Sequence, residues 1–299
     1  MDNNTKQIIV HDGTFHADDV ICVAILRMVN SSIVVRRLSL SCLPKNEDET
    51  TIIADVGFGK YDHHQVDAKC RNDGKKHAAC GLILNKFEDY LFPKGAPTEF
   101  LKWICQIEDN DNKDVDSKED LISEYVRLSN PEWNEDQSVD SYDDSFMKVV
   151  KVIINRFITP YITHQQLSAD NYSFFVEQVN KLRTKHMEAE LAAREVVIKA
   201  YEESNRHVVV LDKRLPWYNI LIETEAQFVI NPSNRGGYHL QCIPSKVGSN
   251  KFKLLLPSSW INTPPNGCSF VHRKLFIAAF SDLNYAVDAA NEVIKRRSI

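Results

Sequence analysis

Two short segments of the chain concentrate side chains that bind metal ions. Four of the ten histidines fall in these segments, and each segment also carries aspartates. Imidazoles mixed with carboxylates suit Mn²⁺, Zn²⁺, Fe²⁺ or Co²⁺ better than Ca²⁺. The candidate ligands and their neighbours are His11, His16 and Asp18 in the first segment, and Asp55, Asp62, His63 and His64 in the second.

This set is too large for one tetrahedral ion. It suits two ions about 3.5–4 Å apart that share a bridging carboxylate. Such a pair activates water near neutral pH and binds the oxygens of a phosphoryl group. The residue types therefore indicate metal-assisted phosphoryl chemistry.

The first third of the chain should supply the elements that hold these residues. Apolar and β-branched runs at 7–10, 33–38 and 51–56 alternate with helical patterns at 18–29, 80–91 and 98–107. This order predicts βαβ units and a mostly parallel sheet. His11 and Asp55 each follow a predicted strand, so we expect both at the carboxyl edge of the sheet, where α/β folds bind ligands.

The rest of the chain predicts a second lobe. The acidic stretch 108–144 is expected to be a solvated surface segment. The expected fold class is α/β with two lobes: residues 1–195 form a metal-binding catalytic domain, and residues 205–299 a smaller substrate-binding α/β domain. A long helix at 170–203 should connect them. The remaining predicted elements are helices at 144–157 and 282–297, and strands at 207–211, 227–230, 238–243 and 252–256.

Composition narrows the functional classes. With 299 residues, 43% hydrophobic and 26% charged, the chain is globular rather than disordered. A net charge of −5 excludes a uniformly basic nucleic-acid binder. Seven cysteines without a Cys-x-x-Cys pair indicate reduced core residues, typical of a cytosolic protein. We expect no signal or transit peptide, no membrane span, and a cytoplasmic or nuclear location.

The motifs resemble a known superfamily. His-x4-His-x-Asp, the strand-end aspartate and the tripeptide Asp-His-His are similar to those of the DHH phosphoesterases, which include RecJ-type exonucleases, family II pyrophosphatases and oligoribonucleases. Within it, the chain resembles the melanocyte-proliferating-gene (Myg) family, long labelled metal-dependent protein hydrolase. The resemblance implies a DHH-like catalytic lobe. The matching segments are 11–18, 55–57, 61–65, 81–83, 109–110, 127–134, 216–217, 241–244 and 267–272.

The resemblance also implies roles for individual residues. His64 would face the scissile phosphate, and Asp62 would orient an imidazole by accepting its second N–H. Asp55 would bridge the two ions. The implied ligands are His11, His16 and Asp55 for one ion, and Asp18, Asp55, His63 and Asp109 for the other.

The implied activity is that of a 3′-to-5′ RNA exonuclease that hydrolyses phosphodiester bonds with two divalent ions. Mn²⁺ is the expected metal, with Mg²⁺, Zn²⁺ and Co²⁺ as alternatives. Single-stranded RNA or a short oligonucleotide is the expected substrate. Two alternatives stay open: hydrolysis of a small phosphate compound such as a dinucleotide or pyrophosphate, and a metal-binding protein without activity. The expected substrate contacts are Lys60, Lys75, Lys76, His272 and Arg273.

Three departures from the family pattern bear on these roles. The family's Ser-Ser-Ala-Gly is Ala78-Ala79-Cys80-Gly81 here, so two hydroxyl groups are missing. Its Asp-Asn-Gly is Asp109-Asn110-Asp111. Its glycine-rich Gly-Phe-Ile-Gly-Gly segment is replaced by residues 275–279, Leu-Phe-Ile-Ala-Ala. Glycines let backbone N–H groups approach a phosphate, so their loss predicts a looser hold on substrate.

Overall fold

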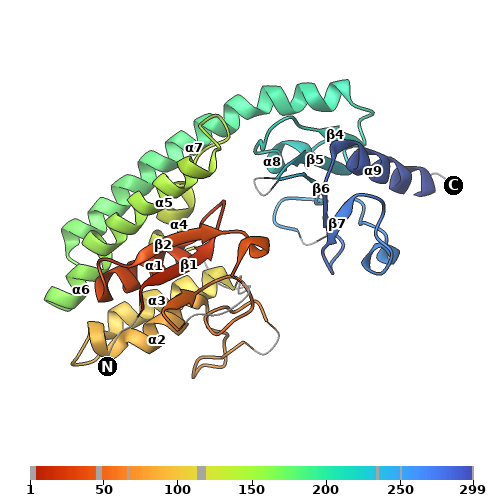
Figure 1. Cartoon of the computed structure of the whole chain (residues 1–299). Coiled ribbons are helices and arrows are strands. Elements are labelled where there is room, and N and C mark those ends of the chain that lie inside the picture. Colours follow the sequence, from red (N-terminus) through yellow and green to blue (C-terminus); the bar gives the residue numbers. More distant parts are fainter. Residues whose placement is uncertain are drawn as a thin grey trace. The chain divides into compact units, whose positions relative to one another are not determined.

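The chain folds into two units that each have their own core. The computed structural model describes residues 5–44, 49–65, 68–112, 119–233, 236–249 and 251–297 (Figure 1). One unit comprises Met1–Pro131 and Asp136–Thr184, and the other Glu132–Glu135 and Lys185–Ile299. The division falls inside the long helix α7 (Ala169–Glu203), earlier than residue 195.

The first unit is built on a parallel sheet in the order β2-β1-β3. Its strands are β1 (Gln7–His11), β2 (Val34–Leu38) and β3 (Thr51–Ile53). Gln7 pairs with Val34 on one side and with Thr51 on the other. The central strand β1 is buried from Ile8 onward, as expected when helices cover a parallel sheet. Because all three strands are parallel, the residues that follow β1 and β3 lie at the same edge of the sheet.

Helix α1 (Ala17–Val29) lies at the centre of this unit. It packs against the helices α2, α3, α4 and α5 and against β1, and almost all of its residues are buried. This explains why its sequence is apolar on most sides. The surrounding helices are α2 (Ala79–Leu91), α3 (Thr98–Asp111), α4 (Leu121–Leu128), α5 (Val139–Ile153), the π-helical turn Ile154–Ile158 and α6 (Thr159–His164).

Helix α7 contributes to both cores. Phe175 and Val179, in its first half, are buried in the core of the first unit. Ala193 and Val197, in its second half, are buried in a cluster of the second unit. The apolar residues of this helix therefore belong to two hydrophobic cores in succession.

The second unit is a mixed sheet in the order β4-β5-β6-β8-β7, with helix α9 (Leu283–Arg297) against it. β4 and β5 are parallel, and the other pairs are antiparallel. Phe228 and Leu240 of the sheet pack in one cluster with Ala286 and Ala290 of α9. The remaining elements are β4 (Val208–Val210), α8 (Tyr218–Leu221), β5 (Phe228–Pro232), β6 (Tyr238–Cys242), the 3₁₀ turn Ser258–Ile261, β7 (Cys268–Val271) and β8 (Ile277–Phe280).

The predicted α/β fold class is confirmed, with two local differences. Residues 252–256 form no strand, because Phe252 makes only an isolated bridge to Pro244, whose nitrogen carries no hydrogen to extend a ladder. The acidic stretch is not purely surface, because α4 lies within it and buries Ile122 and Val126.

Across the described ranges, no helix combines the length and the apolar character that a membrane crossing requires.

Candidate metal centre

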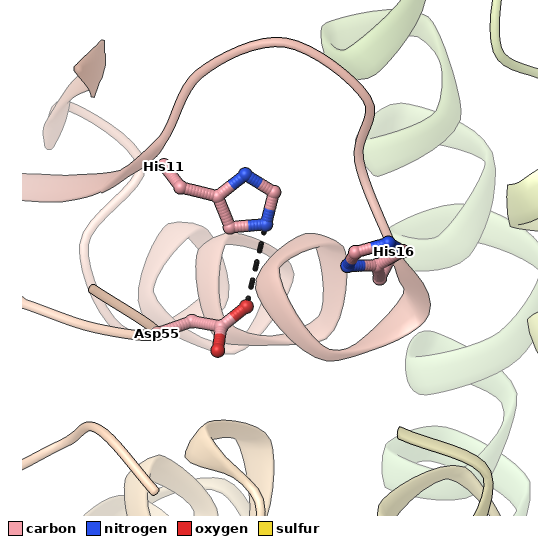
Figure 2. A group of neighbouring side chains, drawn as sticks. All are labelled: His11, His16 and Asp55. Atoms are coloured by element: carbon pink, nitrogen blue, oxygen red, sulfur yellow. Dashed lines mark ion pairs between the residues drawn. The ribbon is translucent and has the colours of Figure 1, made fainter. Parts of the chain in front are cut away.

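The loop from β1 to α1 presents two histidines. His11 ends β1, and its Nδ1 lies 3.0 Å from the carbonyl oxygen of Asp12. A carbonyl can only accept, so Nδ1 carries the proton and Nε2 is the atom left to bind a metal. His16 stands at the N-cap of α1, and the two rings are 5.5 Å apart. Figure 2 shows both rings beside Asp55, with His11 paired to its carboxylate.

Asp55, the first residue of the second segment, has an unusual backbone conformation. Its φ is 58°, in the left-handed region that aspartate tolerates better than most residues. The carboxylate is buried, and its two oxygens face different histidines. Oδ2 is 3.4 Å from His11 Nε2, and Oδ1 is 3.2 Å from His63 Nε2. This is the arrangement that a bridging carboxylate needs.

A second group of ligand atoms surrounds His63. Its Nε2 lies 3.0 Å from Asp111 Oδ2 and 3.9 Å from Asp18 Oδ2. His63 Nδ1 lies 3.1 Å from Asn112 Oδ1, which orients the ring. The structure thus brings together a histidine-rich group and an aspartate-rich group that share one carboxylate. Their members are His11, His16 and Asp55, and Asp18, Asp55, His63 and Asp111.

The N-terminus of α2 fixes Asp18. The backbone N–H groups of Ala79 and Cys80 donate to the two carboxylate oxygens, at 3.0 and 2.7 Å. The chain has no hydroxyl side chain at Ala78, the N-cap of α2, so carboxylates satisfy the first N–H groups of the helix. Asp18 is therefore held rigidly in spite of the missing serines.

The structure places Asp111, and not the expected Asp109, beside His63. Asp109 binds Lys75 at 2.9 Å and also pairs with Arg71, and within the described residues it belongs to neither ligand group. Both aspartates lie in the last turn of α3, which extends to Asp111. Residues two apart on a helix point about 200° apart, so only one of them can lie beside His63.

The second histidine of Asp-His-His is more exposed than the first. The side chain of His64 is 54% exposed, against 6% for His63. Its Nδ1 lies 2.6 Å from Asp62 Oδ1, and Asp62 Oδ2 accepts the N–H of Phe58 at 2.7 Å. Asp62 thus orients the imidazole of His64. The ligand atoms of Asp55, His63 and His64 also lie within 4.8 Å of one another, so the geometry admits His64 as a further ligand.

Charges in the site shift the ionisation of its histidines. Burial lowers the pKa of His11, but the carboxylates of Asp19 and Asp55 outweigh it and raise the pKa to about 9. Burial likewise opposes the change at His63, where hydrogen bonds to Asp111 and Asp55 raise the pKa to about 11. Burial raises the pKa of Asp18 well above its usual range. A cation entering the site would replace these protons.

Sequence reasoning missed two further buried acids. Asp19 accepts the N–H of His16 at 2.9 Å and lies 3.3 Å from His11 Nε2. Glu108 accepts from His77, from the backbone of Ala78 and from Arg71. Glu108 also explains the glycine at position 81, because a Cβ there would lie 1.8 Å from its carboxylate.

The site opens into a cavity of 630 Å³ that also receives two of the expected substrate contacts, Lys75 and Lys76. Lys60 is not part of its lining, and its Nζ lies 5.2 Å from the ring of Tyr61. The cavity is lined by His63, His64, Lys75, Lys76, Asp109, Asp111 and Asn112.

The other expected contacts, His272 and Arg273, belong to the second unit, in the turn between β7 and β8. Leu275 closes this turn with a φ of 61° and donates its N–H to the carbonyl of His272. Ala278 and Ala279 lie inside β8, which pairs with β6 on one side and with β7 on the other. Their backbone groups therefore belong to sheet ladders rather than to an open loop.

Comparison with known proteins finds relatives that match nearly the whole chain. The MYG1 protein of Schizosaccharomyces pombe is 24% identical, with 98% of each chain covered. A protein named MYG1 exonuclease in Mus musculus is also 24% identical, covering 96% of this chain and 84% of its own. A solved pGpG-specific phosphodiesterase from Vibrio superposes with a TM-score of 0.44 at 11% identity, covering 98% of both chains.

The family model described as "MYG1_exonuc: Uncharacterised protein family (UPF0160)" matches residues 7–294. That span includes both ligand groups and both units. The chain belongs to the MYG1 family, UPF0160.

Proposed function

We propose that this protein is a two-metal phosphodiesterase that removes nucleotides from the 3′ end of single-stranded RNA. The observation that carries the proposal is the position of Asp55. Its two oxygens face His11 and His63, and so one carboxylate joins two ligand groups. Shared carboxylates of this kind hold the ion pairs of phosphodiesterases.

The donor set fits two divalent cations. His11, His16 and Asp55 would hold one, and the aspartate-rich group the other. When bound, such ions activate water and neutralise the charge of phosphoryl oxygens. Mixed imidazole and carboxylate ligands favour Mn²⁺, while Mg²⁺, Zn²⁺ and Co²⁺ are alternatives.

The remaining residues at the cavity would act on the substrate directly. His64 is exposed and held by Asp62, so it would donate a hydrogen bond to the phosphoryl group as negative charge develops there. Lys76 and Lys75 line the same cavity and would contact the nucleic-acid backbone.

Exonuclease activity is supported by the family rather than by the geometry. Relatives in mouse, rat and human carry the name MYG1 exonuclease. The preference for RNA and the 3′-to-5′ direction follow from the resemblance and are part of the proposal.

We further propose that His272 and Arg273 contact the substrate through their side chains. Because Ala278 and Ala279 are engaged in sheet ladders, their backbone N–H groups are not available to a phosphate, and the side chains of His272 and Arg273 would make the contact instead. Binding through charge weakens steeply with salt. The expected result is a KM that rises with ionic strength, and that rises further in Arg273→Ala with little change in kcat.

One observation keeps a second candidate. A cavity of 630 Å³ lies in the range of small-molecule sites and would admit a dinucleotide. A hydrolase of small phosphate compounds would use the same ligands and the same water.

The deciding experiment uses chelator-treated protein reloaded with Mn²⁺ and single-stranded oligoribonucleotides labelled at either end. A 3′-to-5′ exonuclease converts 5′-labelled RNA into a descending ladder and releases the 3′ label at once as a mononucleotide. Matched DNA oligonucleotides and a dinucleotide complete the set. Turnover of the dinucleotide alone would favour the second candidate. Two bound ions without hydrolysis of any substrate would contradict both and indicate a metal-binding protein without activity.

A further inference from the structure

The loop between β1 and α1 would bring two histidines, His11 and His16, to one ion. It contains Gly13, whose φ is 75°, and it joins a strand end to a helix start. Two side chains from elsewhere in the first unit hold the backbone of this loop. Neither belongs to the ligand groups.

Asn130 is the first of these side chains. Its Oδ1 accepts the N–H of Phe15 at 2.9 Å, and its Nδ2 donates to the carbonyl of Phe15 at 2.9 Å. Both backbone groups of the residue before His16 are thus bound by one side-chain amide. The bonds join positions 115 residues apart in the sequence. Nδ2 also donates to the carbonyl of Arg127, which fixes the amide at the end of α4.

Arg37, on β2, is the second. Its Nη2 donates to the carbonyl of Gly13 at 2.6 Å, and its Nη1 binds Asp143 at 2.8 Å. The guanidinium lies 4.6 Å from the ring centroid of Phe146 and is buried with it. A planar group that is bound on two edges and one face has little freedom, so the guanidinium holds the backbone of Gly13 at a fixed distance from β2.

The side chain of Phe15 attaches the loop to the hydrophobic core of the first unit. It is fully buried and packs edge-on against Phe146 at 5.6 Å. The same Phe146 supports Arg37, so the two contacts form one connected arrangement. The loop is therefore fixed on both sides of Thr14, at Gly13 by Arg37 and at Phe15 by Asn130.

We propose that Asn130 and Arg37 are positioning residues that preorganise His11 and His16 for the ion they share with Asp55; this inference rests on the proposed two-metal function. It gives a role to the matched segment 127–134, which the ligand groups leave unexplained. The aspartate-rich group does not depend on the loop, because Asp18 is held by α2 and Asp111 ends α3. Loss of Asn130 therefore weakens one ion site and spares the other.

The test is a Mn²⁺ titration of the chelator-treated full chain, followed by electron paramagnetic resonance and total metal analysis. Two Mn²⁺ ions bridged by one carboxylate give an exchange-coupled spectrum, whereas a single ion gives an isolated six-line spectrum. Asn130→Ala should bind the first-group ion about 10–100-fold more weakly, the size typical for residues that orient ligands. At limiting Mn²⁺ it should show the isolated signal, with the other ion bound at wild-type affinity.

Two further variants guard against misfolding. Asn130→Asp keeps the acceptor for the Phe15 N–H and loses the donor, so it should retain part of the coupling. Arg37→Lys keeps the charge but loses one of the two bonds, and should also weaken the first-group ion. Asn231→Ala is the matched control, since it removes a buried asparagine of the second unit that binds Gln241. It should lower thermal stability without altering the coupled spectrum.

The outcomes separate this inference from the function beneath it. A wild-type protein without a coupled ion pair would overturn both. A coupled wild type whose Asn130→Ala and Arg37→Lys variants keep both ions at wild-type affinity would overturn the inference alone. Equal weakening of both ions in Asn130→Ala would assign the residue a general structural role and would also contradict it.

Discussion

The two ligand groups reach the same site by different means. The histidine-rich group has two imidazoles and one carboxylate, whereas the aspartate-rich group has three carboxylates and one imidazole. Both His11 and His16 border a loop that distant side chains hold in place. In the other group, Asp18 and Asp111 belong to the ends of helices. The three carboxylates should therefore bind the ion of the aspartate-rich group tightly. The affinity of the histidine-rich group should depend on how well the loop between β1 and α1 is held in place.

Replacement of the shared carboxylate should have the largest effect. Asp55→Asn suits the left-handed backbone, since asparagine also tolerates positive φ, so the fold should survive. Both ions lose a ligand, and kcat should fall by about 10³-fold or more. Metal analysis and single-turnover kinetics check this. A variant that kept two coupled ions would contradict the assignment of Asp55 as a ligand that the two groups share.

The next test concerns the aspartate-rich group alone. Asp111→Asn should lose one ion and reduce kcat by at least about 10²-fold, because its carboxylate lies beside His63. Asp109→Asn is the matched control two residues away. It should change kcat by less than about fivefold, since its partners are Arg71 and Lys75. The reverse ranking in metal content would restore Asp109 as the ligand.

The paired histidines should differ in their effect on metal binding. His63→Ala should lose the second ion, because its Nε2 lies among three carboxylates. His64→Ala should keep both ions and lose about 10²-fold in kcat, the size of one hydrogen bond to a developing charge. Metal content measured beside kcat distinguishes the two. Equal metal loss in both variants would make His64 a ligand.

The smallest expected effect is a difference between the two groups in the number of protons released when metal binds. In the metal-free state His11 and His63 have pKa values of about 9 and about 11, so both are protonated at neutral pH. A ligand imidazole must be neutral, so binding expels these protons and affinity rises with pH. The aspartate-rich group should release more, because burial also raises the pKa of Asp18. Titration calorimetry in buffers of different ionisation enthalpy measures this release. Affinity that is constant from pH 6 to 8 would contradict the assignment.

The sheet edge that carries His11 and Asp55 could be predicted from the sequence because its signals are local. An apolar strand ending at His11, a buried helix after it and an aspartate at the end of another strand are all patterns of a few residues. The choice between Asp109 and Asp111 required the true end of α3, which lies at Asp111, beyond the predicted end at residue 107. Two consecutive Asp-Asn pairs made both readings possible.

Other features depended on contacts that no local pattern contains. The bonds from Asn130 to Phe15 bridge 115 residues, so the segment 127–134 matched the family without showing its purpose. Helix α4 had a usable signal, since Ile122, Tyr125 and Val126 are spaced for one helical face. The acidic residues around this face concealed it, because the prediction of a surface segment used the charge of the whole stretch. Burial is decided residue by residue, and these apolar positions are buried.

Helix α1 places two carboxyl groups of the candidate site inside the hydrophobic core. Asp18 and Asp19 are fully buried on a helix that four others surround, and burial raises the pKa of both carboxyls. Countercharge supplied by bound cations would relieve this cost, and binding to the native state alone adds to its stability. The supply of metal would then govern how long the protein survives proteolysis as well as how fast it turns over substrate.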